Sequence, residues 1–538
     1  MYLNKKIEKK YLIYSIFFFA FLLVGIYSFD DYGISIDENY HYTNGVHYYS
    51  FLKGILFPGG EYLTIQELRE SFQYHHFKDP AIFDLIIAFI IDLFNLENSV
   101  DIILLRHLFI FLIFFIGTFY FFLILKENFN NNFLILFGLL FLILSPRIFA
   151  NSFYNNKDLI FLSVTCIFFY YSIKFFLSPS YYKALMFGIF SSLAFDIRIM
   201  AIIYIFTFYV MVFLFYMDNK DNFKKNIKYY FSAIIFSVIF TYIFWPYLWI
   251  DPINNLIDFF SVIKNETPAM QNLYFGKYIF SKNIPWHYEF TWILITSPIC
   301  IISFFFFGYF LNVFYFSKNL LDVENPKHKF WFDKKEFVNL YIFCAFTLTF
   351  VIKLKFGVMY GGWRQIYYLY PLIIFFGLIG LEFLLKKIKK KIIINLIFLL
   401  IITELTFLAF WNFKNHPFQF VYFNPIFKSV TKNRFDLDYW GISNKFILKK
   451  ILEINKNQPF KVTTVSFTNL NDSLRILSTK DREKIAIVYS VNQADFVIDN
   501  YMKKWSSTPG EENLAKNFKI VYNLIIDKNI INTVYQRN

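Results

Sequence analysis

Two adjacent carboxylates, Asp37 and Glu38, follow the first long apolar segment of this sequence and are its strongest candidates for chemistry. They stand in a loop, residues 31–41, that also carries aromatic and polar side chains. A carboxylate in such a loop can remove a proton from a hydroxyl group or help to hold a divalent cation. Taken alone, the pair also fits an ordinary hydrated loop, so its function depends on the groups that the fold places beside it.

A second acidic candidate, Asp158, ends a polar cluster at residues 145–158 that lies between two apolar segments. Asp158 opens the next predicted helix, where the dipole of the helix favours a negative charge. Its position therefore fits either a functional acid or a residue that stabilises the start of that helix.

Two basic residues could bind an anionic group at the membrane surface. Lys78 suits a phosphate headgroup, although it could also extend its charge to the interface without binding one. Arg364 enters an apolar segment, and a guanidinium group there can hold a phosphate through two parallel hydrogen bonds. The adjacent His75 and His76 lack a spaced third ligand, which argues against a zinc site.

Three further ionisable residues lie within or between apolar segments. Asp196 and Arg198 stand in one short turn, and we expect them to form a structural ion pair. Glu404 lies deep in the last apolar segment and needs either a partner or a proton.

The elements that must position these residues are membrane-spanning helices. The chain has 538 residues, of which 57% are hydrophobic and 17% charged, and many of the apolar residues form runs long enough to cross a bilayer. We expect about eleven spans. They are residues 11–29, 102–125, 133–144, 159–176, 184–195, 199–216, 229–244, 291–316, 337–352, 366–385 and 392–410.

The distribution of lysine predicts the orientation of these spans. The net charge of +14 could indicate nucleic acid binding, but the Lys-rich segments fall in alternate loops between the spans. This pattern follows the positive-inside rule and predicts a cytoplasmic N-terminus with an extracytoplasmic C-terminus in the inner (plasma) membrane. The apolar segment 81–94 would break the alternation, so we expect an amphipathic helix there at the outer surface. No nucleic acid partner is expected.

Composition changes after about residue 411. Three segments, 461–467, 484–490 and 518–526, have the pattern of short strands, with polar helical segments between them. We expect a membrane domain at 1–411 and a small soluble α/β domain at 412–538. The sequence contains neither a GxGxxG pattern nor a P-loop, and use of a nucleotide is therefore unsupported.

Five segments together resemble a bacterial family of GT-C glycosyltransferases, glycosyltransferase family 39-like, which is related to protein O-mannosyltransferases and to the aminoarabinose lipid A transferase. The segments are GISIDE (33–38), PRIFANSFYNNKD (146–158), WPYLW (245–249), GWRQIYYLYP (362–371) and HPFQFVYFNP (416–425), continued by DYWG (438–441). Their order and their predicted outward placement carry the resemblance, since each motif alone is of modest specificity.

The resemblance implies an all-α polytopic membrane protein of GT-C type, with a small C-terminal extracytoplasmic α/β domain. It implies an inverting transfer of a sugar from a polyprenyl-phosphate donor to a hydroxyl group of a glycan, lipid or protein. Asp37 would be the general base or would help to hold a divalent metal, with Glu38 in support. Asp158 matches the second acidic position of the family, and Lys78 and Arg364 match basic positions that contact the lipid phosphate.

Cofactor use stays open at this point, because a divalent cation such as Mg²⁺ or Mn²⁺ could be held by Asp37 and Asp158. Two other functions also stay open: a transporter or flippase of lipid-linked saccharides, and a ligase or polymerase of lipid-linked glycans. A flippase would need charged groups along a route to both faces of the membrane. The candidate residues cluster on one predicted side, and this favours the transferase.

Overall fold

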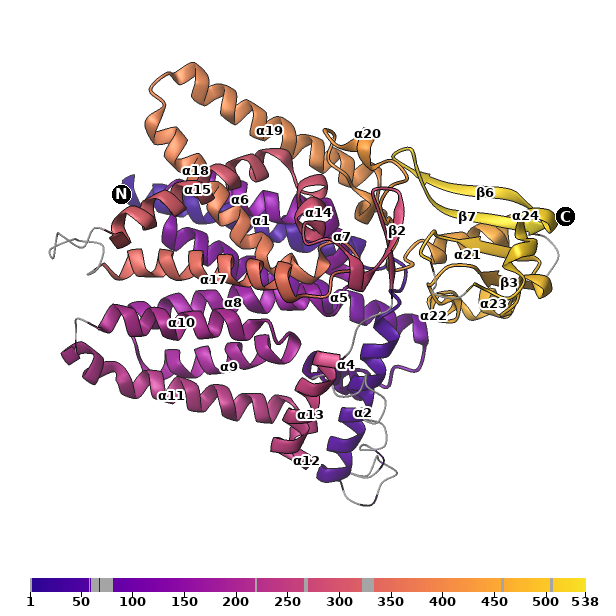
Figure 1. The fold of residues 1–538 in the computed structure, drawn as a ribbon, viewed down its shortest axis with the longest axis horizontal. Coiled ribbons are helices and arrows are strands. Elements are labelled where there is room, and N and C mark those ends of the chain that lie inside the picture. Colours follow the sequence, from indigo (N-terminus) through magenta and orange to yellow (C-terminus); the bar gives the residue numbers. More distant parts are fainter. Residues whose placement is uncertain are drawn as a thin grey trace.

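The structure, a computed structural model, describes residues 2–57, 59, 67, 81–217, 220–265, 270–321, 333–455, 459–503 and 507–538. Most of these residues form a bundle of long helices, and a five-stranded sheet lies at one end of the bundle (Figure 1). The expected class, an all-α polytopic membrane protein with a small C-terminal α/β region, is confirmed.

Eleven of the described helices build the bundle. They are α1 (Tyr2–Ser28), α5 (Ser99–Asn128), α6 (Asn132–Leu144), α8 (Asp158–Leu177), α9 (Tyr181–Ile197), α10 (Ala201–Tyr216), α11 (Lys220–Phe244), α15 (Ile299–Leu321), α17 (Lys334–Phe356), α18 (Tyr370–Lys387) and α19 (Lys391–Lys414). By length and composition, seven helices of the described chain could cross a membrane, or eight if the bent pair α6 and α7 (Pro146–Tyr154) is one span. The protein is therefore a multi-pass membrane protein. The count stays below the expected eleven because α9, α10 and the segment Leu12–Ser28 are each too short to meet these criteria.

Helix α8 is the centre of the bundle. In its most apolar stretch 83% of the residues are buried, whereas the corresponding figure for α11 is 11%. A helix that is apolar on all sides and enclosed by other helices has little freedom to shift, so its first residue is held firmly. That first residue is Asp158.

The predicted span at 291–316 is interrupted. Helix α14 (Tyr288–Thr296) ends before Ser297 and Pro298, and α15 begins at the next residue. Proline cannot donate a backbone hydrogen bond, which favours a break at this point. The carboxylate of Glu404 accepts hydrogen bonds from the backbone N–H groups of Ile299 and Cys300 at 2.5 and 2.9 Å. The partner that Glu404 requires is thus the N-terminus of α15.

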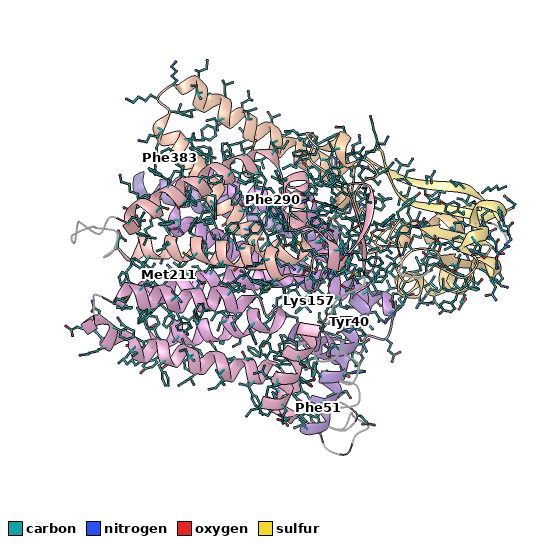
Figure 2. The ribbon with its side chains drawn as sticks, in the orientation of Figure 1. Tyr40, Phe51, Lys157, Met211, Phe290 and Phe383 are labelled. Carbon is teal, nitrogen blue, oxygen red and sulfur yellow. The ribbon has the colours of Figure 1, made fainter. Side chains whose placement is uncertain are left out.

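The two ends of the bundle differ. The C-terminal ends of α5, α8, α10 and α18 adjoin the Lys-rich connections predicted from the sequence, and they all lie at the end opposite the sheet (Figure 1). The sheet end carries α2 (Glu38–Leu56), α4 (Ile82–Leu93), α12 (Tyr247–Ile250), α13 (Pro252–Asn265), η2 (Ser281–Asn283), η3 (Arg364–Leu369), η4 (Gln419–Val421) and a hairpin of β1 (Gln271–Tyr274) and β2 (Lys277–Phe280). Side chains of Tyr40 and Lys157 appear at this end in Figure 2, whereas Met211 lies further along the bundle.

Helix α4 covers the segment that was expected to be an amphipathic helix, and it packs tightly against α2. A side chain at Gly45 of α2 would stand 2.4 Å from the backbone carbonyl carbon of Asp84 in α4. Only glycine permits α2 and α4 to approach so closely. The close packing of the two helices brings Asp84 toward the loop that precedes α2.

The C-terminal region forms a mixed sheet of order β4-β3-β5-β7-β6. Its strands are β3 (Phe460–Thr464), β4 (Ile485–Ile487), β5 (Phe496–Asp499), β6 (Phe518–Ile526) and β7 (Asn529–Arg537), and its short helices are α20 (Lys428–Thr431), α21 (Asn444–Ile454), α22 (Leu470–Leu474), α23 (Thr479–Arg482), η5 (Val491–Gln493), η6 (Glu511–Asn513) and α24 (Leu514–Asn517). Strands β3, β4 and β6 match the expected segments, whereas β5 and β7 were not expected. Helix α21 covers one face of the sheet, with Ile447, Leu448 and Ile451 in a shared core.

Candidate active site

The carboxylate of Asp158 is almost fully enclosed, with 1% of its side chain exposed. One oxygen accepts a hydrogen bond from Arg198, and the other accepts from Arg364 at 3.0 Å and from Asn155 at 3.1 Å. The side-chain oxygen of Asn155 in turn accepts from the backbone N–H of Asp158 at 2.9 Å. Both oxygens of Asp158 are therefore committed to holding cationic side chains, as a buried charge requires.

Arg364, at the start of η3, is fixed by Asp158 and by three aromatic rings. Its guanidinium carbon lies 5.0, 4.8 and 4.5 Å from the ring centres of Tyr360, Tyr439 and Trp440. One of its terminal nitrogens also donates to the Tyr439 hydroxyl at 3.1 Å. Cation–π contacts of this kind are strong when they are removed from water. The positive charge of Arg364 therefore has a fixed position.

Backbone geometry permits this placement of Arg364. Gly361 has φ 65° and a side chain there would stand 2.8 Å from the Nε atom of Arg364. A left-handed residue directly beside a large side chain is a position for glycine. Gly361, directly before the motif at 362–371, thus makes room for the guanidinium group.

Asp37 immediately precedes α2 and differs from Asp158 in exposure and partners. It keeps 35% of its side chain accessible, and its carboxylate lies 3.9 Å from a terminal nitrogen of Arg364. Burial raises the pKa of Asp37 above its ordinary value, the charge of Arg364 opposes that rise, and the negative charge of Asp158 adds to it. A carboxylate with a raised pKa is a better proton acceptor than a free one, and this suits a general base.

Glu38 is fully enclosed and shapes the loop. Its carboxylate accepts from the backbone N–H of Ser35 at 2.7 Å and lies 3.3 Å from Nε2 of His107. Its backbone carbonyl accepts from Arg106. Glu38 therefore acts through the conformation of the loop that carries Asp37, and the described contacts give it no direct access to a substrate.

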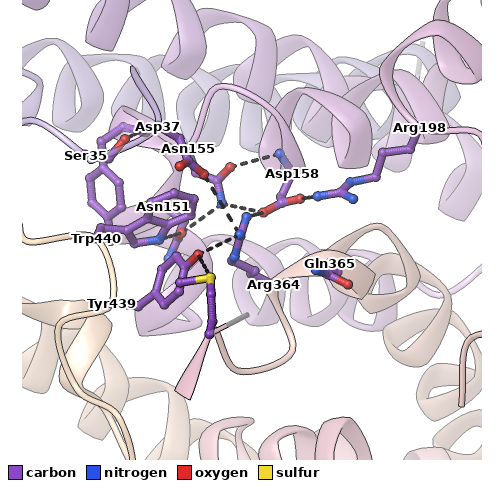
Figure 3. A network of polar contacts seen from close by, with 12 residues as sticks. Ser35, Asp37, Asn151, Asn155, Asp158, Arg198, Arg364, Gln365, Tyr439 and Trp440 are labelled. Carbon is purple, nitrogen blue, oxygen red and sulfur yellow. Dashed lines mark hydrogen bonds and ion pairs between the residues drawn. The ribbon is translucent and has the colours of Figure 1, made fainter. Parts of the chain in front are cut away.

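The C-terminal motif DYWG connects the two acidic segments (Figure 3). The backbone carbonyl of Trp440 accepts from the N–H of Ile36 at 3.1 Å, and its indole N–H donates to Asn151 at 3.2 Å. Asn151 accepts in turn from Asn155, which contacts Asp158. One continuous polar network thus runs from the Asp37 loop to Asp158 and Arg364, which are far apart in the sequence.

The other predicted phosphate-binding residue, Lys78, lies outside the described residues, as do His75 and His76. Of the predicted site residues, the structure therefore brings together Asp37, Asp158 and Arg364, with Glu38 behind them.

The expected ion pair between Asp196 and Arg198 is not formed. Arg198 bonds to Asp158 instead, and neither carboxylate oxygen of Asp196 has a hydrogen-bond partner among the described residues. Asp196 lies in the last turn of α9, whereas Arg198 has extended backbone angles of φ −147° and ψ 122°. The change in backbone direction separates the two side chains.

Asp84 is an acidic neighbour of the site that the sequence analysis did not select. Its carboxylate accepts from Asn156 at 3.2 Å, and burial raises its pKa to about 6, while the charge of Arg106 opposes that rise. Lys157 acts electrostatically on both Asp84 and Asp37. The available signal was the presence of acids, Asp84 and Asp92, inside the apolar segment 81–94.

A cation shared by Asp37 and Asp158 does not fit this arrangement. Both oxygens of Asp158 accept from arginine, and two guanidinium groups would repel a divalent ion. Among the described residues, no group of three or more His, Cys, Asp or Glu side chains could hold a metal ion.

Comparison with known proteins gives one match to a family model. Residues 78–245 match the model of dolichyl-phosphate-mannose-protein mannosyltransferase, a segment that includes Asp84 and Asp158. No curated protein matches the chain.

Two crystal structures of ArnT from Cupriavidus metallidurans align with most of the chain. The apo state aligns at 12% identity over 99% of this chain and 98% of that one, with a TM-score of 0.46. The structure bound to undecaprenyl phosphate aligns at 10% identity over 97% and 98%, with a TM-score of 0.44. The family model alone shows that residues 78–245 carry the sequence pattern of the mannosyltransferase family, in agreement with the resemblance to GT-C glycosyltransferases seen in the motifs.

Proposed function

We propose that this protein is a membrane glycosyltransferase that moves a sugar from a polyprenyl-phosphate donor to a hydroxyl group of an acceptor. The match to the mannosyltransferase family model and the order of the five motifs support the reaction class. The observation that carries the proposal is the position of Asp37, a partly exposed carboxylate 3.9 Å from a guanidinium group that Asp158 and three aromatic rings hold in place.

In the proposed reaction Asp37 removes the proton of the acceptor hydroxyl as its oxygen attacks the anomeric carbon of the sugar. The bond between that carbon and the phosphate oxygen breaks, and the polyprenyl phosphate leaves with the bonding electrons. Attack from the face opposite the phosphate inverts the anomeric configuration. A positioned base and a fixed positive charge near the leaving group are the two groups that such a step requires.

Arg364 and Lys78 are proposed to bind the donor phosphate. Arg364 already donates hydrogen bonds to Asp158 and Tyr439. Its main contribution would therefore be a fixed positive charge that attracts the phosphate electrostatically. Asp158 would then act on the donor through Arg364. The phosphate is an activated leaving group, so this reaction needs no nucleotide.

The proposed location is the outer face of the inner membrane. The Asp37 site and the sheet lie at the end of the bundle away from the Lys-rich connections (Figure 1). Under the positive-inside rule those connections are cytoplasmic, which would leave the site and the C-terminal region 412–538 extracytoplasmic. A hexose or pentose donor and a glycan, lipid or protein acceptor are all compatible with this arrangement.

A donor screen tests the proposal. The purified full-length protein in lipid nanodiscs would be incubated with a panel of polyprenyl-phosphate sugars and acceptors, with and without Mg²⁺ or Mn²⁺. We expect one donor to be consumed, with release of polyprenyl phosphate and formation of a product of inverted configuration. A parallel assay would use the protein in liposomes. Movement of a lipid-linked sugar from one leaflet of their bilayer to the other, without consumption of any donor, would contradict the proposal and support a flippase. Transfer of a preassembled oligosaccharide would indicate a ligase or polymerase.

A further inference from the structure

We infer that Lys445 is a positioning residue that holds the loop of Asp37 in place from the C-terminal region. Lys445 is the second residue of α21 and is 7% exposed. Its ammonium group donates to three consecutive backbone carbonyl groups, those of Asp30, Asp31 and Tyr32, at 2.8, 3.0 and 2.9 Å. An ammonium group has three donors, and all three are used here.

The segment that Lys445 holds leads directly to Asp37. It leaves the end of α1 at Ser28 and reaches the start of α2 within nine residues, without regular structure of its own. Backbone carbonyl groups in such a segment need donors from elsewhere when they are buried. Lys445 supplies three of them from a position more than 400 residues away in the sequence.

Two further contacts join the same segments. A side chain at Gly33 would stand 2.4 Å from the backbone oxygen of Ile442, so the two chains pass each other in direct contact. The N–H of Ile36 donates to the carbonyl of Trp440 at 3.1 Å. Residues 440–445 therefore run along residues 30–36, and Lys445 is the charged group of that contact. The role of Asp37 as base rests on the proposed function, whereas the contact itself does not.

The charged groups that face Lys445 decide how the contact responds to pH. The pKa of Lys445 is lowered to about 8, chiefly by burial and also by Lys449 on the same helix, against the opposing charges of Asp31 and Asp30 on the loop. His416 lies beyond Asp31, with its Nε2 atom 2.7 Å from that carboxylate. Because burial disfavours the charged ammonium group, the docked contact releases its proton at a lower pH than a solvated lysine does. Docking of the loop therefore does not weaken as pH rises through about 8.

Hydrogen exchange measures the contact without any knowledge of the substrate. The full-length protein in nanodiscs would be compared with Lys445→Met and with Lys449→Met, which removes an exposed lysine of the same helix. The amides of Ser35 and Ile36, both hydrogen-bonded, are the reporters. We expect them to exchange at least about tenfold faster in Lys445→Met, since hydrogen bonds from a charged group are lost, while Lys449→Met stays at the wild-type rate. Equal rates in all three proteins would overturn the inference.

A second variant covers the case in which Lys445→Met fails to fold. Lys445→Gln keeps a polar side chain, but its amide has two donors where the ammonium group has three. We expect the amides of Ser35 and Ile36 to exchange about two- to tenfold faster than in the wild-type protein, because at least one hydrogen bond is lost, while amides of α8 keep their rate. Exchange of the loop at the wild-type rate in folded Lys445→Gln would overturn the inference.

Catalysis gives the second readout once a donor is known. Lys445→Met should lower kcat for each folded molecule and leave the KM for the lipid donor near the wild-type value. A merely destabilised protein would instead contain fewer folded molecules, each with an unchanged kcat. If no donor is found, the proposed function fails, and the exchange result still decides the role of Lys445.

Discussion

Asp37 and Asp158 lie in one site but in opposite surroundings. Asp158 starts the most enclosed helix of the bundle, is 1% exposed and bonds to two arginines and an asparagine. Asp37 stands at the end of an irregular loop, is 35% exposed and has a single arginine at 3.9 Å. The motifs gave the two acids different expected roles without showing how each is held, and their environments now separate them. Asp158 holds two arginines, whereas Asp37 keeps the exposure that its proposed role as a base requires.

The comparison also separates the two segments by what holds them. The start of α8 is fixed by packing on all sides of its helix. The Asp37 loop is instead fixed by hydrogen bonds that it donates to Glu38 and Trp440 and accepts from Lys445. A loop held by a few polar contacts is more open to adjustment than a packed helix end.

The largest effect is expected for Asp158→Asn. This change leaves Arg198 and Arg364 without their shared counter-ion, and breaking a buried ion pair costs about 3–5 kcal/mol. We expect a large fall in the free energy of unfolding, measured as the thermal midpoint and the folded fraction in detergent. Asp37→Asn is the matched control and should leave the midpoint near the wild-type value. Equal destabilisation by the two changes would contradict the separation of their roles.

A change of opposite sign is expected for Asp436→Asn. Asp436 is buried and accepts one hydrogen bond from the N–H of Leu273 at 3.0 Å. Unlike Asp158, it has no arginine within 4 Å of its carboxylate among the described residues. Burial raises its pKa to about 7, against a smaller opposing effect of that N–H and of Arg147.

Its contribution to stability follows from the direction of that shift. Because the folded state holds the proton more tightly than the unfolded state, stability falls as pH rises from 3.8 through about 7. Asn carries no charge at any pH, so we expect a gain of about 1–2 kcal/mol at pH 8 and none near pH 4. Thermal midpoints measured from pH 4 to 8 check this. A gain that is the same at every pH would contradict it.

The smallest effect is expected for Glu404→Ala. The carboxylate caps the N-terminus of α15 after the break at Pro298, and loss of a helix cap costs about 1 kcal/mol. We expect a small fall in the thermal midpoint with an unchanged rate of transfer. Glu382→Ala on α18, which removes an exposed pair with Lys386, is the control and should have almost no effect.

Much of the fold could be predicted from the sequence because the bilayer requires long apolar helices. The helix ends could be placed only where the apolar pattern stops, and the break at Pro298 lies inside an apolar run. Strand β7 (529–537) was missed because its residues are largely polar, and it is defined by pairing with β5 and β6.

The site residues could be named but not arranged. The outward motifs identified Asp37, Asp158 and Arg364, yet the partner of Arg198 lies 40 residues earlier in the sequence rather than two. Lys445 could not be selected, because its partners are backbone carbonyl groups that have no side-chain signal. Tertiary contacts of this kind depend on the assembled fold.

The most direct test of the central claim separates donor binding from transfer in Asp37→Asn. The variant and the wild-type protein, both in nanodiscs, would be titrated with undecaprenyl phosphate and then assayed with the donor that the screen identifies. We expect binding within a factor of about two and a rate of transfer lower by about 10²–10⁴, the contribution of a general base. A folded Asp37→Asn protein that transfers sugar at the wild-type rate would contradict the assignment of Asp37.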